Sequence, residues 1–200
     1  QGGGYRESEQ ALALIEENVD ANGRLAAEDL SIQFAILARR PEPDSWRKAL
    51  VILERLSSLQ PLASGQRMQR AQLLEQLGRW DEARDQLLSI ASAPGTPPLV
   101  VSLLIERLVQ HRELGAARIW LKSLSNRIPK SPLVAALEAK LALAENDRTT
   151  AVSAVRRLMP GDAAAPELAG HLGPLADLLE GLGFTTAAEQ VFSQFAASSS

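Results

Sequence analysis

The sequence predicts an all-α fold, a right-handed superhelix (solenoid) of about five antiparallel helix pairs. One observation behind this prediction is an alanine that returns every 34 residues, at Ala49, Ala83, Ala117 and Ala151. A second is that the residues four and seven positions after each alanine are apolar, which places all three on one helix face. These apolar residues are Leu53, Leu56, Leu87, Ile90, Leu121, Leu124, Val155 and Leu158. A third is that glycine, asparagine and proline separate the periodic stretches, as expected where helices end.

The N-terminal part follows this pattern only weakly. Residues 6–19 have apolar residues at helical spacing, but the 34-residue step back from Ala49 lands on Ile15, and the residue seven positions later is the polar Asn22. We therefore expect a partial repeat here, closed by a turn at residues 20–24 that contains an Asn-Gly step. Residues 1–5 are expected to be a flexible linker or tag remnant.

The first full repeat joins a helix at 25–40 to a second helix that begins after Pro43. Proline lacks a backbone donor and ends the first helix, while Asp44 or Ser45 can cap the second, which stops before Pro61. The next repeat is predicted to have helices at 66–77 and 81–91, with Gly78 at the turn.

The later repeats carry the same signals. Pro97 or Pro98 starts a first helix, where proline costs least, and Asn146 takes the place of Gly78 at the turn of the fourth repeat. A fifth copy has Ala188 with Phe192 and Phe195, after a gap of 37 residues. The predicted organisation is a single solenoid at 6–195 with repeats 6–24 (partial), 25–61, 62–96, 97–130, 131–163 and 166–195, followed by a disordered tail at 196–200.

Composition narrows the class of protein. The 200-residue chain is 46% hydrophobic and 22% charged, as in ordinary soluble proteins. A formal net charge of −3 with no run of like charge disfavours nucleic acid as a partner. No apolar run approaches the roughly 20 residues that span a bilayer, and the absence of cysteine excludes disulfides and thiolate chemistry. The chain is expected to be a fragment of a larger, bacterial-type protein; its compartment is left unknown, with the cytoplasm slightly favoured.

The repeat resembles the tetratricopeptide repeat, a 34-residue helix-turn-helix unit, as a divergent member. The residues that match its small first-helix position are Ala35, Ala71, Ala139 and Ala176, with Ile105 as an exception. Trp46 and Trp80 match the aromatic at the turn, whereas Leu114 and Arg148 do not. The exit proline is matched by Pro61 and Pro129, with Pro94 one residue early. Aromatic content is only 4%, so leucine and alanine fill several positions that are usually aromatic.

This resemblance implies a scaffold that binds a peptide or a partner helix in a concave groove lined by the first helices. The residues expected on that surface are Arg39, Arg40, Gln72, Glu75, Gln76, Glu106, Gln110 and Lys140. The Lys and Asn arrangement of the subfamily that binds chaperone tails is not found, which disfavours that role. Trp120 precedes the core position Leu121 and is expected either to pack against the next repeat or to act as a surface anchor.

No catalytic, cofactor-binding or metal-binding residues are predicted. The two histidines, His111 and His171, lie nearly two repeats apart, which disfavours a shared metal site or a nucleophilic relay. Neither a P-loop nor a dinucleotide fingerprint is present. Two alternatives to the scaffold stay open: a self-association or spacer module, and a helical enzyme domain, which is disfavoured because no set of acid, base and nucleophile converges.

Overall fold

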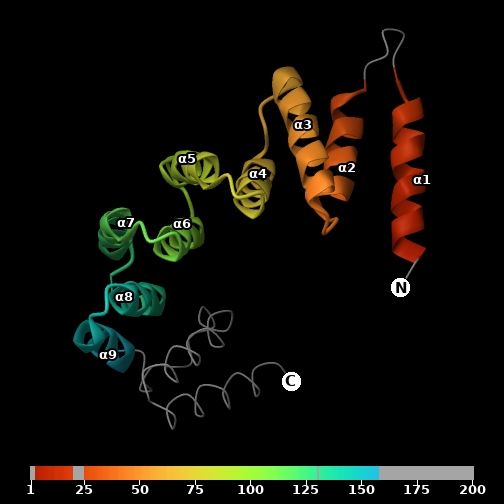
Figure 1. Cartoon of the computed structure of the whole chain (residues 1–200). Coiled ribbons are helices and arrows are strands. Elements are labelled where there is room, and N and C mark those ends of the chain that lie inside the picture. Colours follow the sequence, from red (N-terminus) through yellow and green to blue (C-terminus); the bar gives the residue numbers. More distant parts are fainter. Residues whose placement is uncertain (1–2, 20–24, 130, 158–200) are drawn as a thin grey trace, which may run out of the picture. The chain divides into compact units, whose positions relative to one another are not determined.

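The computed structural model describes residues 3–19, 25–129 and 131–157 (Figure 1). Within these ranges the regular elements are helices, with one isolated antiparallel bridge between Val19 and Leu25. Their bounds are α1 Gly3–Glu17, α2 Ala27–Ala38, α3 Pro43–Leu59, α4 Ser64–Gln76, α5 Trp80–Ala91, α6 Pro98–Gln110, α7 Leu114–Arg127, α8 Pro132–Ala144 and α9 Arg148–Arg156. The predicted turn at 20–24, the fifth repeat at 166–195 and the tail at 196–200 lie outside the described residues.

The chain forms two compact units, an N-terminal unit (Gln1–Ala93) and a C-terminal unit (Pro94–Ser200). In the N-terminal unit α2 packs on α3 and α4 on α5, and α3 also contacts α4. In the C-terminal unit α6 packs on α7 and α8 on α9, while α8 also contacts both α6 and α7. Each pair is joined by a short turn, so its two helices form a hairpin. The predicted all-α architecture of helix pairs is confirmed for the described repeats.

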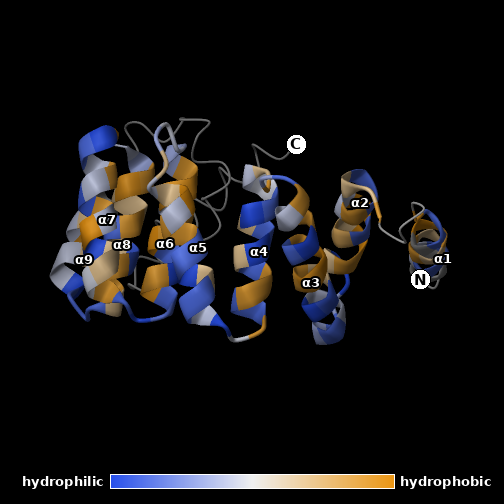
Figure 2. Cartoon of the chain, turned by 90° about the horizontal axis from the view of Figure 1, so that it is seen from above, coloured by the Kyte–Doolittle hydropathy of each residue, from blue (hydrophilic) through white to orange (hydrophobic). Residues whose placement is uncertain are grey.

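The alanine that returns every 34 residues is fully buried in each pair. Ala49, Ala83, Ala117 and Ala151 all have no exposed surface. Of the apolar residues that follow them, those whose side chains the structure describes are at most 6% exposed. A methyl group at this position lets the two helices approach closely, and the bulky residues on the same face fill the space beside it. Figure 2 shows the resulting alternation of polar and apolar stretches along the helices.

The first helices of three successive repeats end in the same way. Gly78, Arg112 and Asn146, each one 34-residue step from the next, adopt a left-handed backbone with φ of 75°, 62° and 62°. In each case the following residue, Arg79, Glu113 or Asp147, donates its N–H across the turn over 2.8 Å. This is the Schellman arrangement, which satisfies carbonyl groups that the end of a helix leaves unpaired. The predicted turns at Gly78 and Asn146 are confirmed.

The first repeat ends its first helix differently. Helix α2 stops at Ala38, and the Trp46 indole Nε1 donates a hydrogen bond of 2.6 Å to the Arg40 carbonyl. The indole therefore pairs a carbonyl group near the end of α2, as the left-handed turn does at the ends of the first helices in later repeats. At the N-terminus, helix α1 begins at Gly3, inside the segment that was expected to be a linker. The first turn of a helix does not depend on intrahelical N–H partners, so glycine can stand there.

Candidate functional site

In the C-terminal unit the expected binding surface is formed by α6 and α8, the first helices of consecutive repeats. Lys140 on α8 forms an ion pair with Glu106 on α6, exactly one repeat away in sequence. The structure thus brings together two of the predicted residues from different helices. Gln110 lies one turn further along α6, and its side chain is exposed.

The ion pair gives this surface a particular electrostatic character. The side chains of Lys140 and Glu106 are 30% and 28% exposed, so both remain accessible to a partner. Their charges offset each other, which leaves a polar but nearly neutral patch on the two helices. Such a patch can select a ligand by shape and hydrogen bonding, whereas it offers little long-range attraction for a strongly charged one.

In the N-terminal unit the expected surface residues fall into two places. Gln72 and Gln76 on α4 are exposed, and Glu75 between them is half-buried. Helix α4 is tied to α2 by a hydrogen bond of 3.4 Å from Gln66 to Ser31. This link shows that the first helices α2 and α4 are neighbours in this unit as well.

Arg39 and Arg40 instead line a pocket of about 600 Å³ between α1 and α2. Its other walls are largely apolar, including Ile32, which is 52% exposed, and Ala35. Arg40 also forms an ion pair of 2.5 Å with Glu9 on α1, and its side chain is only 10% exposed. Arg40 therefore holds α1 against α2 and presents less of its charge to solvent than the sequence suggested.

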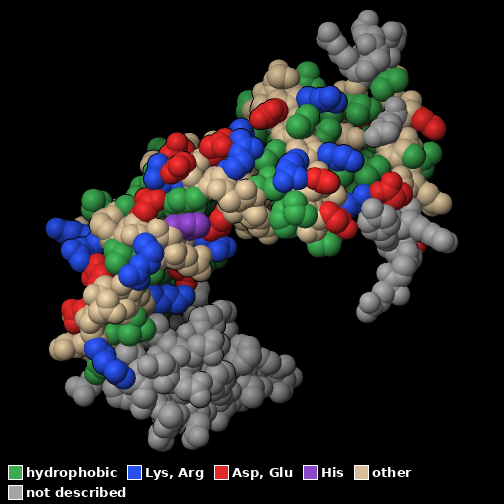
Figure 3. Space-filling model, viewed as in Figure 1, with side chains coloured by type: hydrophobic (Ala, Val, Ile, Leu, Met, Phe, Trp, Pro, Cys, Tyr) green, Lys and Arg blue, Asp and Glu red, His purple; other side chains and the backbone are tan. Residues whose placement is uncertain are grey.

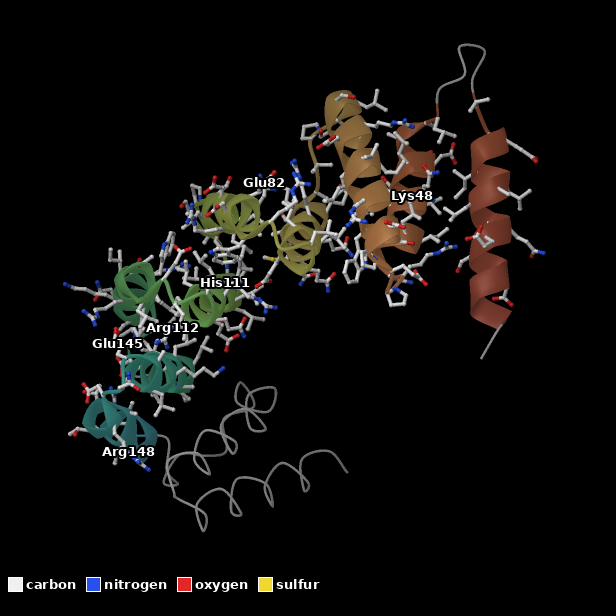
Figure 4. All side chains as sticks on the ribbon, in the orientation of Figure 1. Lys48, Glu82, His111, Arg112, Glu145 and Arg148 are labelled. Atoms are coloured by element: carbon white, nitrogen blue, oxygen red, sulfur yellow. The ribbon has the colours of Figure 1, made fainter. Side chains whose placement is uncertain are left out.

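The expected surface anchor Trp120 is half-buried on α7, next to Ile119, which is 72% exposed. Together they form a small apolar area on a second helix, whereas Glu106 and Lys140 lie on first helices. His111 is exposed and ends α6, as expected for a histidine near a helix terminus (Figure 4). His171 lies outside the described residues.

A second pocket of the N-terminal unit was missed by the sequence analysis. It lies between α1, α2 and α3, has a volume of about 530 Å³ and is lined by several basic side chains of α3. Figure 3 shows basic side chains on the face of this unit over α2 and α3. A signal was present in the sequence, because Arg55 has no acidic residue three or four positions away on its own helix.

A pocket of about 660 Å³ lies between α7, α8 and α9. Helices α8 and α9 form the fourth repeat, and α7 is the second helix of the repeat before it. Here arginines and glutamates from different helices meet: Arg118 pairs with Glu145 over 2.5 Å, and Arg157 pairs with Glu138. These ion pairs tie α8 to its neighbours on both sides.

The carboxylates with shifted pKa values lie at helix starts. A hydrogen bond from Arg79 lowers the pKa of Glu82 in the first turn of α5. Hydrogen bonds from Thr150 lower the pKa of Asp147, which precedes α9. Asp147 accepts the backbone N–H of Thr150 and so caps α9. Glu82 instead forms an ion pair with the side chain of Arg79, and its charge in the first turn favours the helix dipole.

The described residues contain neither a candidate metal site nor a candidate membrane span. No group of three or more His, Asp or Glu side chains there is placed to hold a metal ion. Among the same residues, no helix combines the length and apolar character needed to cross a membrane.

Comparison with known proteins supports the fold. No family model matches the chain, and no curated protein does. Among solved structures it is similar to "MamA RS-1 ArsTM double mutant", with a TM-score of 0.55 and 14% identity over 86% of this chain and 93% of that one. It is also similar to the APC/C hetero-tetramer Cut9-Hcn1, with a TM-score of 0.53 and 15% identity over 94% of this chain and 38% of that one. These likenesses support a tetratricopeptide-like helical repeat and confirm the α-α superhelical class.

Proposed function

We propose that this protein is a non-enzymatic scaffold for protein-protein interaction, which binds a peptide or a partner helix on the surface of its first helices. The observation that carries the proposal is the contact between α6 and α8, which joins Glu106 and Lys140 from consecutive repeats into one polar surface. Peptides and helices are commonly bound on such continuous helix surfaces.

The packing beneath this surface favours a rigid binder. Ala139 and Ile105 on the buried faces of α8 and α6 have no exposed surface, so the polar residues above them stand on a closely packed base. A rigid surface loses little conformational entropy on binding, which favours recognition by shape with a few polar anchors. The expected anchors are Gln110 and the Glu106 and Lys140 pair, with Gln72 and Gln76 on α4 in the N-terminal unit.

The test is an affinity pull-down from a lysate of the source organism with the parent protein and two triple variants. The first carries Gln72→Ala, Glu106→Ala and Lys140→Ala on first helices. The control removes the same three residue types outside the first helices, with Glu54→Ala on α3, Gln60→Ala directly after α3 and Lys122→Ala on α7. Both variants are first shown to be folded by circular dichroism. A protein retained by the parent and the control but lost with the first variant supports the proposal. Equal retention by both variants contradicts it.

Self-association is the second candidate function, because Ile119 and Trp120 leave an apolar area exposed on α7. Aromatic residues of this kind contribute strongly to interfaces. Sedimentation over a range of concentrations tests it: a mass that rises with concentration in the parent, and stays monomeric with Ile119→Ser and Trp120→Ala, supports a self-association module. A constant monomeric mass of the parent contradicts it.

A further inference from the structure

The pocket between α1, α2 and α3 has walls of two kinds. Leu12 of α1, Leu37 of α2 and Ile52 of α3 supply apolar surface, while α3 contributes the exposed cations Lys48 and Arg55. These two cations are seven residues apart on one helix face, with Ile52 between them. Figure 4 labels Lys48 where it extends from α3.

The basic side chains of this pocket differ in whether they have a partner. Arg40 is paired with Glu9 over 2.5 Å, and Arg47 with Asp44 over 2.5 Å. In contrast, Lys48 and Arg55 have no carboxylate partner among the residues whose side chains the structure describes. Among the described side chains that line the pocket, positive charges therefore outnumber negative ones.

The pocket of the fourth repeat contains a cation at the position equivalent to Arg55, and there it has a carboxylate partner. Arg157 lies three 34-residue steps after Arg55, and it is paired with Glu138 on the first helix of its repeat. Glu138 directly precedes the small residue Ala139, whereas the residue that directly precedes the matching Ala35 is Phe34. Phe34 is buried in the core, with 1% exposure. The first repeat therefore has the arginine of the fourth repeat without a carboxylate at the position that pairs with it there, whereas the second and third repeats have Ser89 and Ser123 in place of the arginine.

A buried polar group in the same pocket also lacks a partner. Gln33 on α2 is only 7% exposed and lines the pocket, and its amide oxygen Oε1 has no hydrogen-bond partner. Leaving a buried amide oxygen unpaired is unfavourable, so such groups usually have a hydrogen-bond partner, either water or a donor of the protein or of a ligand. A ligand that fills this pocket is therefore expected to carry a donor as well as a negative charge.

We propose that this pocket binds an acidic peptide segment of a partner protein. Glutamate or aspartate side chains of the segment take the place of the missing carboxylate and pair with Arg55 and Lys48, while a peptide N–H donates to Gln33. One peptide residue carries both groups, and the apolar walls accept the aliphatic part of the segment. The pocket is separate from the polar surface of α6 and α8, so this inference goes beyond the proposed function.

The experiment measures fluorescence anisotropy of a labelled deca-glutamate peptide with the full chain at low ionic strength. A deca-glutamine peptide of the same length reports binding that does not depend on charge. Saturable binding of deca-glutamate is expected, and the double variant Lys48→Gln and Arg55→Gln should weaken it by about tenfold or more. Arg79→Gln removes one charge from the same unit outside the pocket, and it should change the affinity by less than about twofold.

A second variant tests the missing carboxylate directly. Val51 lines the pocket, is 49% exposed and lies three residues after Lys48 and four before Arg55. Val51→Glu therefore places a carboxylate within reach of both cations on the same helix, a spacing that also favours the helix. It should abolish peptide binding in a chain that remains folded, whereas the neutral Val51→Gln should retain most of it.

Each outcome decides the inference. Loss of binding in Val51→Glu and in the Lys48 and Arg55 variant, with Val51→Gln and Arg79→Gln close to the parent, supports it. Equal binding of deca-glutamine, or parent-like binding by the double variant, overturns it. Free glutarate serves as a competitor: if it binds as tightly as the peptide, the ligand is a small carboxylic acid and the peptide assignment is overturned. The first-helix triple variant should bind deca-glutamate like the parent, which separates this test from that of the proposed function.

Discussion

The left-handed turn at Gly78 allows a quantitative test of how the repeats are built. Its φ of 75° lies in the region that a side chain disfavours, and a Cβ atom added there would meet no atom within 4 Å. The cost of Gly78→Ala is therefore conformational and not steric. A left-handed alanine costs about 1 to 2 kcal/mol, and the lower entropy of the unfolded chain returns about 0.4 to 1 kcal/mol. We expect a net destabilisation of about 1 kcal/mol.

Arg112 provides the matched case one repeat later, since it has the same backbone conformation with a side chain. Its Nη1 donates to the Ala144 carbonyl over 3.0 Å, near Glu145 at the end of α8 (Figure 4). Arg112→Ala should lose this hydrogen bond, worth about 1 kcal/mol, and keep the unfavourable backbone. Arg112→Gly should lose the same hydrogen bond, but glycine adopts the left-handed conformation without the cost that a side chain adds. The two effects offset each other, so its free energy of unfolding should stay near that of the parent.

The assay is urea unfolding followed by helix ellipticity, with each variant compared with the parent. At both position 78 and position 112, the variant or parent with glycine should have a free energy of unfolding about 1 kcal/mol higher than the variant with alanine. That difference corresponds to a midpoint shift of about 0.5 M urea. Equal stability of glycine and alanine at either position would refute the assignment of a left-handed turn there.

Three further predictions concern the packing and the helix ends. Ala83→Leu should destabilise the N-terminal unit by about 1 to 3 kcal/mol through overpacking, because Ala83 has no exposed surface; a stable, well-ordered variant in the same urea assay would contradict the helix register. Trp80→Ala should cost about 2 to 3 kcal/mol, less than the loss of a fully buried tryptophan, because Trp80 is half-buried against the core; an unchanged urea midpoint would count against this contact. Thr150 lowers the pKa of Asp147, so the charged cap stabilises α9 above the ordinary carboxyl pKa and loses that effect as the pH falls through the lowered value. The Asp147→Asn variant has a cap that does not titrate, so the parent should lose stability relative to this variant as the pH falls below the ordinary carboxyl pKa; parallel pH profiles of the two proteins would contradict it.

The buried side of the fold could be predicted from the sequence because burial follows the period. The alanines at each 34-residue step and the apolar residues beside them must fit between helices, so few residue types are allowed there. The turn at Gly78 was predictable for a similar reason, since glycine is the usual residue in a left-handed conformation. Arg112 gave no such signal, because arginine is common in helices and seldom left-handed.

Contacts between side chains were harder to predict. The pairing of Lys140 with Glu106 follows from the period once first helices are known to be adjacent. The hydrogen bond from Trp46 to the Arg40 carbonyl depends on the longer connection of the first repeat, which the period does not describe. The burial of Arg40 depends on how α1 packs against α2, and the N-terminal sequence follows the pattern too weakly to show it.

The first repeat illustrates where function can be sought in a repeat protein. The small and apolar residues that recur in every repeat are explained by the packing of helices within a repeat and against its neighbours. Phe34 in place of a glutamate is consistent with packing, but it leaves Arg55 without the partner that Arg157 has. Arg55 and the buried amide oxygen of Gln33 line the same pocket, so a ligand that carries a negative charge and a hydrogen-bond donor can pair with both. Comparing equivalent positions within the chain therefore locates a candidate site that neither the composition nor the fold class reveals.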